Sequence, residues 1–226
     1  MRVLRGRADD PEADRQVTAE MVERTRETGE PALRVWQPGR HLAFGRRDAR
    51  EPGYGDAREA AAVAGFPPVE RTTGGRAVAY TGTTVAVATA LPDGDLRTGI
   101  PERYDDATEA IQRALWKLGV PAQRGEPADA FCPGSHSLSW KGKIAGLAQR
   151  VRTDVALVGA VVVVDDHAAI ADVLEPVYAA LDLPFDPDTV GSVARAGGRA
   201  DPEAVLETLE TAMLGDEDAE VERVGV

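Results

Sequence analysis

The ten-residue run VALVGAVVVV, at 155–164, contains no polar side chain and favours burial in the folded protein. A transmembrane helix needs about 20 apolar residues, so this run is too short to cross a bilayer. Its valines favour extended backbone, and Asp165-Asp166 ends it. We therefore expect a buried strand here, with the other elements packed around it in one domain over residues 1–226.

Apolar patterns and turn residues predict further strands around this run. They fall at 31–38, at 41–45 after a Pro-Gly turn, at both ends of 68–91, and in a hairpin at 137–151 that turns at Lys141-Gly142. Helical patterns predict helices at 56–66, 103–119, 167–183 and 201–215. This order favours a mixed α/β (α+β) fold built around a largely antiparallel sheet flanked by helices.

Charge and composition exclude several classes of protein. A net charge of −12 lacks the basic footprint that non-specific nucleic-acid binding requires. The N-terminal MRVLRGRADD lacks the apolar core of a signal peptide, and one cysteine gives no disulfide framework, so we expect a cytoplasmic protein without a membrane segment. Acidic residues are spread over the whole chain, which we interpret as a halophilic surface. A melting temperature that does not rise with KCl would contradict this interpretation.

The single cysteine lies in FCPGSHSLSWKGK, residues 131–143, a stretch rich in turn residues. A lone cysteine is most often a small buried apolar side chain. The residues after Cys132 show no apolar periodicity, however, which places the thiol in a loop. A loop thiol beside a cation ionises more readily and can act as a nucleophile. His136, four residues further on, is either a general base or a loop residue that faces solvent or ligand.

Lys143 is one of three lysines in a chain that otherwise uses arginine for its cations. A lysine at the end of a hairpin is ordinarily a solvated surface charge. A compact ammonium retained beside Gly142 is also suited to binding an acyl carbonyl or a phosphate oxygen. We therefore treat Cys132 and Lys143 together as a candidate site.

The segment RTTGGRAV, at 71–78, is either a tight turn that requires glycine or a ligand-binding loop. In the second case its N–H groups would approach an oxygen-bearing ligand, with Arg71 or Arg76 beside it. Its spacing matches neither the phosphate-binding loop nor the dinucleotide fingerprint. The three histidines lie far apart and show no metal-ligand spacing to Cys132, so we expect no metal site.

Taken in order, these segments resemble the lipoate-protein ligase and octanoyltransferase family. The resemblance rests on AFGRRDA (43–49), ERTTGGRAV (70–78), GKIAGLAQR (142–150) and VALVGAVVVVDD (155–166). It implies the catalytic-domain fold of biotin/lipoate protein ligases. It also implies two groups of residues that bracket an acyl group: Arg71, Gly74, Gly75 and Ala77 on one side, and Lys143 and Gly146 on the other. Arg76 and His136 stay candidates from the sequence itself.

The Cys-Pro-Gly-Ser loop is similar to that of the family's amidotransferase branch. Members of that branch move an octanoyl group from the glycine-cleavage H protein to lipoyl domains of 2-oxoacid dehydrogenases. By this resemblance Cys132 forms a thioester, Lys143 and N–H groups near Gly74-Gly75 stabilise the oxyanion, and no cofactor is required. The valines expected to wall the acyl chain are Val78, Val85 and Val87.

Two alternatives stay open. The first is a ligase that activates lipoate or octanoate with ATP and Mg²⁺, in which Cys132 is incidental. The second is a non-catalytic acyl-binding relative.

Overall fold

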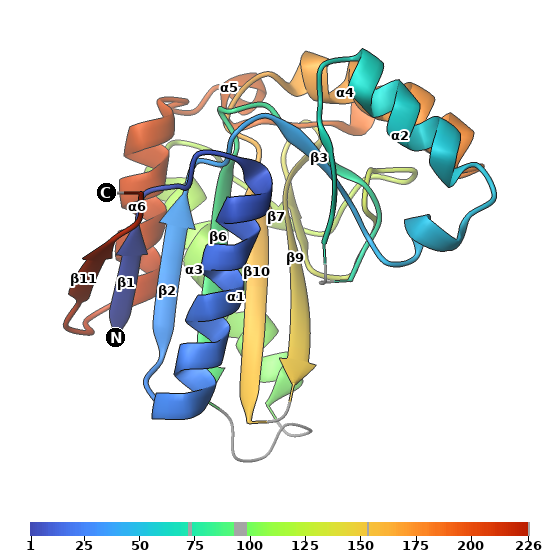
Figure 1. The fold of residues 1–226 in the computed structure, drawn as a ribbon. Helices are drawn as coiled ribbons and strands as arrows, with labels where there is room; N and C mark the ends of the chain where they lie inside the picture. Colours follow the sequence, from blue (N-terminus) through green and yellow to red (C-terminus); the bar gives the residue numbers. More distant parts are fainter. Residues whose placement is uncertain (72–73, 93–98, 153, 226) are drawn as a thin grey trace.

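The structure is a computed structural model that describes residues 1–71, 74–92, 99–152 and 154–225. Its main element is an eight-stranded sheet (Figure 1). In spatial order the strands are β11 (Glu220–Arg223), β1 (Arg2–Arg5), β2 (Ala32–Trp36), β6 (Val85–Pro92), β10 (Val155–Val162), β9 (Lys143–Arg152), β8 (Ser137–Ser139) and β7 (Gln123–Arg124). Neighbours from β2 to β7 are antiparallel, whereas β1 runs parallel to both β2 and β11. The expected largely antiparallel sheet is therefore confirmed.

Helices cover both faces of this sheet. α1 (Pro11–Thr28) lies across one face, and α3 (Ile100–Lys117) and α6 (Pro202–Leu214) pack on the other (Figure 1). The main core lies between the sheet and the α3/α6 layer, and a smaller apolar cluster lies under α1. α6 begins as the sequence predicts, since Asp201 caps it by accepting a hydrogen bond of 2.8 Å from the Ala204 N–H and Pro202 occupies the first helical position.

The apolar run at the centre of the sheet forms β10, as expected. Its residues alternate between the two faces. Ala160 and Val162 are buried in the main core, while Leu157 and Gly159 are only half-buried and face the α1 side. The valine-rich run thus supplies both the core and part of the floor of a cavity beneath α1.

A second, three-stranded sheet lies beside the first. It contains β4 (Pro68–Glu70), β3 (His41–Phe44) and β5 (Val78–Tyr80), in that spatial order. α2 (Tyr54–Val63) and α4 (His167–Ala180) pack on each other and share an apolar cluster with it (Figure 1). β2 and β3 therefore belong to different sheets. The turn at Pro38-Gly39 moves the chain from one sheet to the other, and does not close a hairpin.

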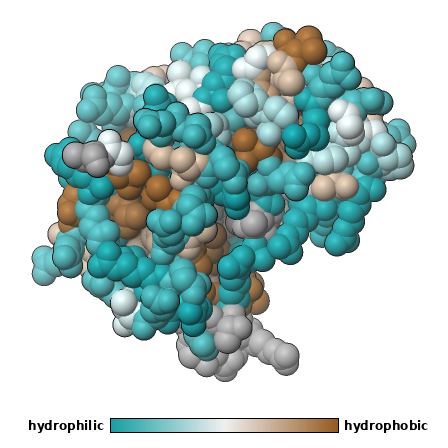
Figure 2. All heavy atoms as spheres, in the orientation of Figure 1, coloured by the Kyte–Doolittle hydropathy of each residue, from teal (hydrophilic) through white to brown (hydrophobic). Residues whose placement is uncertain are grey.

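Three shorter helices complete the elements that the structure describes. They are η1 (Asp48–Arg50), η2 (Pro187–Thr189) and α5 (Val193–Ala196). None of the helices among the described residues is long and apolar enough to cross a membrane. Figure 2 shows a mostly hydrophilic face, with apolar side chains gathered in separate patches between the polar ones.

The long helix α1 was not expected from the sequence. Its buried positions include polar residues, Asp14 and Thr25, beside Met21 and Val22, so its hydrophobic periodicity is weak. Its start does carry a signal: Asp10 accepts hydrogen bonds of 2.9 Å from the N–H groups of Glu12 and Ala13, and Pro11 follows it. The buried Asp14 is balanced by Arg34 of β2, whose guanidinium lies 2.5 Å from it.

Candidate functional site

A cavity of about 480 Å³ lies between α1, the sheet and the loop that carries Cys132. Its lining brings together the predicted residues Arg71, Gly74, Gly75, Cys132, His136, Lys143 and Gly146. Ala77 is fully buried beside the cavity, and Arg76 lies in the same loop. Segments that are far apart in the sequence therefore meet at one place, next to the only thiol of the chain.

The floor of the cavity consists of small residues on neighbouring strands. Gly159 of β10 lies opposite Ala88 of β6 and Ala148 of β9, and all three line the cavity. Side chains this small leave room over the sheet for an extended ligand. Of the valines expected to wall an acyl chain, Val78 and Val87 border the cavity. Val85 and Val87 both belong to the core beneath α3 and α6, and of these two only Val87 also lines the cavity.

Cys132 sits in a left-handed backbone conformation, with φ of 43°, which is unusual for a residue with a Cβ. Its N–H donates a hydrogen bond of 2.6 Å to the hydroxyl of Tyr178 on α4. That hydroxyl donates in turn to the carbonyl of Ala77, at 3.0 Å. Burial, and then the negative charge of Cys132, raise the pKa of Tyr178, so its hydroxyl stays protonated and able to donate.

The sulfur of Cys132 accepts two hydrogen bonds from the Gly-Gly loop. Nη2 of Arg71 and the backbone N–H of Arg76 each lie 3.3 Å from Sγ. Burial is the largest single effect on the pKa of Arg71 and lowers it, but Cys132, Tyr80 and Tyr178 together act against burial, and the net pKa is raised. A cation and a backbone dipole thus face the sulfur, which is the environment that stabilises a thiolate.

Two glycines allow this close approach. A Cβ on Gly75, whose φ is +98°, would lie 2.6 Å from Sγ of Cys132 and 2.7 Å from Nη2 of Arg71. A Cβ on Gly45 would lie 2.0 Å from the carbonyl oxygen of Gly75. The motifs AFGRRDA and ERTTGGRAV are therefore in backbone contact, and larger residues at these positions would separate them.

Arg76 is held on the far side of the loop by two carboxylates. Its guanidinium lies 2.7 Å from Glu51 and 3.3 Å from Asp48. Asp48 is fully buried and also accepts a hydrogen bond of 2.8 Å from the Gly45 N–H. Burial raises the pKa of Asp48, although Gly45 and Arg76 act against it. These contacts fix the backbone N–H of Arg76 where it meets the sulfur.

Lys143 lies inside the protein, with only 1% of its side chain exposed. Its ammonium contacts Glu126 at 2.7 Å and donates to the backbone carbonyls of Phe131, at 3.0 Å, and Cys132, at 2.8 Å. An ammonium has three N–H donors, so each of them has a partner in this structure. Lys143 therefore holds the backbone of the Cys132 loop, and the cation beside the sulfur is Arg71.

The remaining predicted residues lie close to this centre. Gly146 faces Lys143, because a Cβ there would lie 3.2 Å from the Cε of that lysine. His136 stacks on Tyr104, with ring centroids 3.8 Å apart and planes 5° apart. The stacked ring of His136 forms part of the cavity wall. Among the contacts of the described residues, none joins His136 to the thiol.

Sequence reasoning missed three residues of the site. Glu126 binds Lys143 and also accepts hydrogen bonds from the Gly134 N–H and the Ser137 hydroxyl. Tyr178 and Asp48 hold the Cys132 and Gly-Gly loops from elements distant in sequence. Asp48 stands inside the AFGRRDA motif and could have been singled out there. Tyr178 lies on the apolar face of a helix, where a tyrosine gives no signal.

A sulfur beside a cavity, with hydrogen-bond donors aimed at it, is suited to covalent acyl transfer. Among the described residues, no group of three or more His, Cys, Asp or Glu side chains could hold a metal ion.

Family models, curated proteins and solved structures each give matches to this chain. A family model described as the lipoyl protein ligase A/B catalytic domain matches residues 10–211. An octanoyl-[GcvH]:protein N-octanoyltransferase of Exiguobacterium sibiricum is 32% identical over 153 residues, which cover 66% of this chain and 55% of that protein. A lipoyl-[GcvH]:protein N-lipoyltransferase of Listeria monocytogenes is 27% identical over 119 residues, which cover 52% and 43%. The chain spans about half the length of the curated relatives it matches.

Solved structures agree in fold. Lipoate-protein ligase A bound with ATP superimposes with a TM-score of 0.78 at 18% identity, over 100% of this chain and 88% of that one. Ta0514, a putative lipoate protein ligase from T. acidophilum with bound lipoic acid, gives 0.71 at 19% identity, over 100% and 89%. The expected catalytic-domain fold is therefore confirmed.

Proposed function

Because the chain belongs to the lipoyl protein ligase A/B catalytic-domain family, we propose that it is an acyltransferase that attaches an octanoyl or lipoyl group to a lysine of a lipoyl-domain protein. The observation that carries this proposal is the sulfur of Cys132, which sits at a cavity of about 480 Å³ with Arg71 and the Arg76 N–H at 3.3 Å. The relatives' names add that acyl groups carried by GcvH are substrates of similar enzymes. We propose the cytoplasm as its location, where a single thiol stays reduced.

The reaction has two balanced steps. In the first, the sulfur of Cys132 attacks the carbonyl carbon of the donor's acyl-lysine amide, a C–S bond forms and the C–N bond breaks. The thiol proton leaves with the donor lysine as its free amine. In the second, the neutral amine of the acceptor lysine attacks the thioester, the new amide forms, and the proton returns to sulfur. The net result is exchange of one acyl amide for another, without nucleotide.

The residues of the site have separate parts in this proposal. Arg71 and the Arg76 N–H stabilise the negative sulfur before attack and after the thioester breaks. Lys143 fixes the carbonyls of Phe131 and Cys132, and thereby the direction of the thiol. For Lys143 to bind the developing oxyanion, one of its three present acceptors has to be exchanged for the acyl oxygen. The small-residue floor at Gly159 and Ala148 takes the acyl chain.

The pH dependence of the second step follows from its nucleophile. An acceptor lysine has an ordinary pKa of about 10.4 and attacks only when neutral. The rate of transfer should therefore rise with pH until the acceptor amine is largely deprotonated.

A donor-only incubation tests the first step. The protein is mixed with octanoylated H protein, without acceptor and without nucleotide, and its intact mass is measured before and after hydroxylamine. We expect an added octanoyl group on Cys132 that hydroxylamine removes, since thioesters are cleaved whereas amides persist. Cys132→Ala should show neither the adduct nor transfer to a lipoyl domain, while its unfolding free energy should stay within about 1 kcal/mol of the original, because replacing a small, partly buried thiol by a methyl group removes little buried area.

The same assay separates the alternatives. Transfer that requires ATP, Mg²⁺ and free octanoate, and that survives in Cys132→Ala, would replace this proposal with an ATP-dependent ligase. Octanoate binding without transfer under either condition would indicate a non-catalytic relative.

A further inference from the structure

The segment between β3 and α2 carries three exposed arginines, Arg46, Arg47 and Arg50. Within the described residues, none of the three has a carboxylate within ion-pair distance. Arginines elsewhere in this chain are commonly paired, as in Arg5–Glu210 and Arg124–Asp105. With a net charge of −12, acidic partners are abundant in this protein, so unpaired arginines grouped in one segment are unexpected on composition alone.

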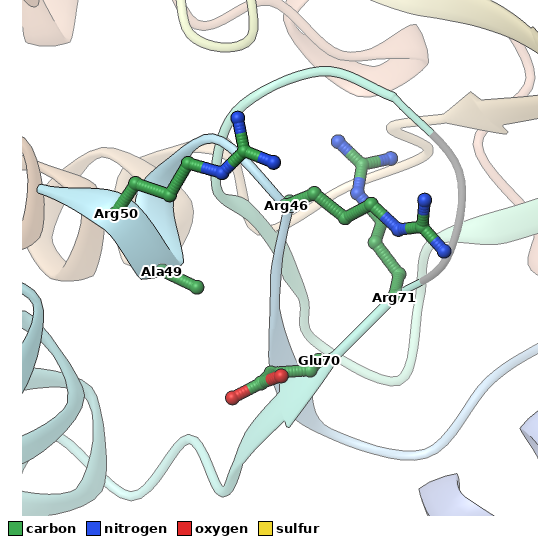
Figure 3. A pocket seen from close by; sticks show the side chains of 6 residues that line it. Arg46, Ala49, Arg50, Glu70 and Arg71 are labelled. Carbon is green, nitrogen blue, oxygen red and sulfur yellow. The ribbon is translucent and has the colours of Figure 1, made fainter.

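Two of these arginines, Arg46 and Arg50, border a hollow of about 260 Å³ next to Arg71 (Figure 3). Arg46, Arg50 and Arg71 line it, and Figure 3 shows their guanidinium groups on one side with the Glu70 carboxylate on the other. Glu70 is itself engaged, since it accepts a hydrogen bond of 2.8 Å from the Tyr54 hydroxyl. Arg71 thus connects the two sites, because it lines this hollow and also reaches the sulfur of Cys132.

Strand β9 adds positive charge on another side of the main cavity. Arg150 and Arg152 line that cavity together with Arg47. The pKa of Arg150 is lowered, first by burial and then by the charges of Arg152 and Arg46. The arginines of β9 and those of the segment between β3 and α2 are therefore close enough to repel each other. We call these five residues, Arg46, Arg47, Arg50, Arg150 and Arg152, the arginine rim.

Like charges that lie close together repel one another, and a bound counter-charge relieves this repulsion. The rim side chains are mostly exposed and border two separate hollows, so they form a surface rather than one closed cradle for a small phosphate. An exposed arginine surface around a reactive cavity matches an acidic protein face. The net negative charge of the chain as a whole repels such a partner, whereas the rim attracts it.

We propose that the arginine rim binds an acidic face of the protein domain that presents its lysine to Cys132. This inference rests on the proposed acyl transfer and adds how the macromolecular substrate is recognised. It has a chemical consequence, because nearby positive charge disfavours the ammonium form of the incoming lysine and so favours the neutral nucleophile.

Binding and catalysis are measured separately to test the rim. The double variant Arg46→Glu/Arg50→Glu is compared with Arg199→Glu/Arg223→Glu, which makes the same charge change at two exposed arginines outside the rim. The Kd for a purified lipoyl domain is measured in the Cys132→Ala background by titration at several KCl concentrations. Loading of Cys132 is followed in the otherwise unchanged protein with p-nitrophenyl octanoate, a donor that has no protein surface.

At low salt we expect the rim variant to bind the lipoyl domain about tenfold more weakly, and the control variant to bind as the parent does. The difference should shrink as KCl rises, because salt screens exposed charges. Loading by the ester should change less than about twofold in both variants, since neither substituted arginine touches the sulfur.

An unchanged Kd in the rim variant would overturn the inference, and so would an equal loss in the control. Weaker binding of inorganic pyrophosphate with an unchanged Kd for the lipoyl domain would instead make the rim a small-phosphate site. Failure of the proposed function is distinguishable from these results. In that case Cys132 would acquire no acyl group from any donor, while the Kd measurement would still report on the rim.

Discussion

The hydroxyl of Tyr178 accepts a hydrogen bond of 2.6 Å from the N–H of Cys132 and donates one of 3.0 Å to the Ala77 carbonyl. One buried side chain on α4 thereby joins the thiol loop to the Gly-Gly loop. Cys132 has a positive φ, which costs roughly 1 kcal/mol for a residue with a Cβ. The hydrogen bond to Tyr178 offsets part of that cost, so this hydroxyl fixes the position of the thiol loop.

Removing the Tyr178 hydroxyl should therefore affect both stability and thiol reactivity. In Tyr178→Phe the Cys132 N–H and the Ala77 carbonyl lose their shared partner, and we expect a loss of about 1–3 kcal/mol in unfolding free energy. The rate of alkylation of Cys132 by iodoacetamide should also change, because the sulfur no longer has a fixed position between Arg71 and the Arg76 N–H. Urea denaturation and alkylation kinetics measure the two effects.

Tyr54→Phe is the matched control. Its hydroxyl donates to the exposed Glu70, so the same deletion should cost less than about 0.5 kcal/mol and leave alkylation unchanged. If Cys132 is alkylated at the parent rate in both variants, Tyr178 stabilises the fold but does not affect the reactivity of the thiol.

Arg71 is expected to control the reactivity of the thiol. In Arg71→Gln the cation at 3.3 Å from the sulfur is lost, and alkylation of Cys132 at neutral pH should slow by about tenfold. Arg223→Gln, an exposed arginine on β11, should alkylate as the parent does. A parent-like rate in Arg71→Gln would mean that the Arg76 N–H alone suffices to hold the thiolate.

Lys143 should behave as a buried structural cation. Lys143→Met leaves Glu126 and two backbone carbonyls without their partner, and breaking a largely buried pair in this way costs about 3 kcal/mol. The same burial decides what Lys143→Arg should do. With 1% of the lysine exposed, the larger guanidinium has to displace its neighbours, so this variant should be destabilised as well as less active. Denaturant titration measures both effects.

Lys117→Met is the control for that measurement, because Lys117 is an exposed lysine at the end of α3. It should change the unfolding free energy by less than about 0.5 kcal/mol. If Lys143→Met were equally mild, the ammonium would not be holding the Cys132 loop.

Local patterns in the sequence predicted much of the sheet and several of its helices. The apolar run that forms β10, the hairpin of β8 and β9, and the amphipathic face of α3 each depend on neighbours within a few residues. Strands β1 and β11 pair with each other although they lie at opposite ends of the chain. Nothing in the four residues EVER of β11 indicates that β1 is its partner. Helix α1 was not predicted for a related reason: its buried Asp14 is stable only beside Arg34, which belongs to another element.

The site shows the same limit. The resemblance to the ligase and octanoyltransferase family implied which loops meet. The contacts within them were not predictable, because Tyr178 lies 46 residues from Cys132 and Arg71 lies 61 residues from it. Sequence reasoning paired the thiol with Lys143, eleven residues away, whereas in the structure that lysine binds the backbone of Cys132 and a distant arginine faces the sulfur.

The stability of the protein should depend on pH through His41 on β3. Its ring is 9% exposed, stacks on Tyr80 with centroids 4.3 Å apart, and donates from Nδ1 to the Gly39 carbonyl at 2.8 Å. Burial lowers the pKa of His41, although Gly39 and Asp14 act against it. The unfolded chain therefore binds a proton near pH 6.5 that the folded protein binds only at lower pH.

Because the unfolded state holds more protons in this window, stability falls as the pH falls below about 6.5, until the folded protein is protonated too. One such group contributes at most about 1.4 kcal/mol per pH unit to the slope of the unfolding free energy. His41→Gln should be less stable than the parent at pH 7.5, since it loses the stacked ring, but its stability should decline less between pH 7 and pH 5. Urea titrations at several pH values give both slopes, and parallel slopes would show that another group is responsible for the acid sensitivity.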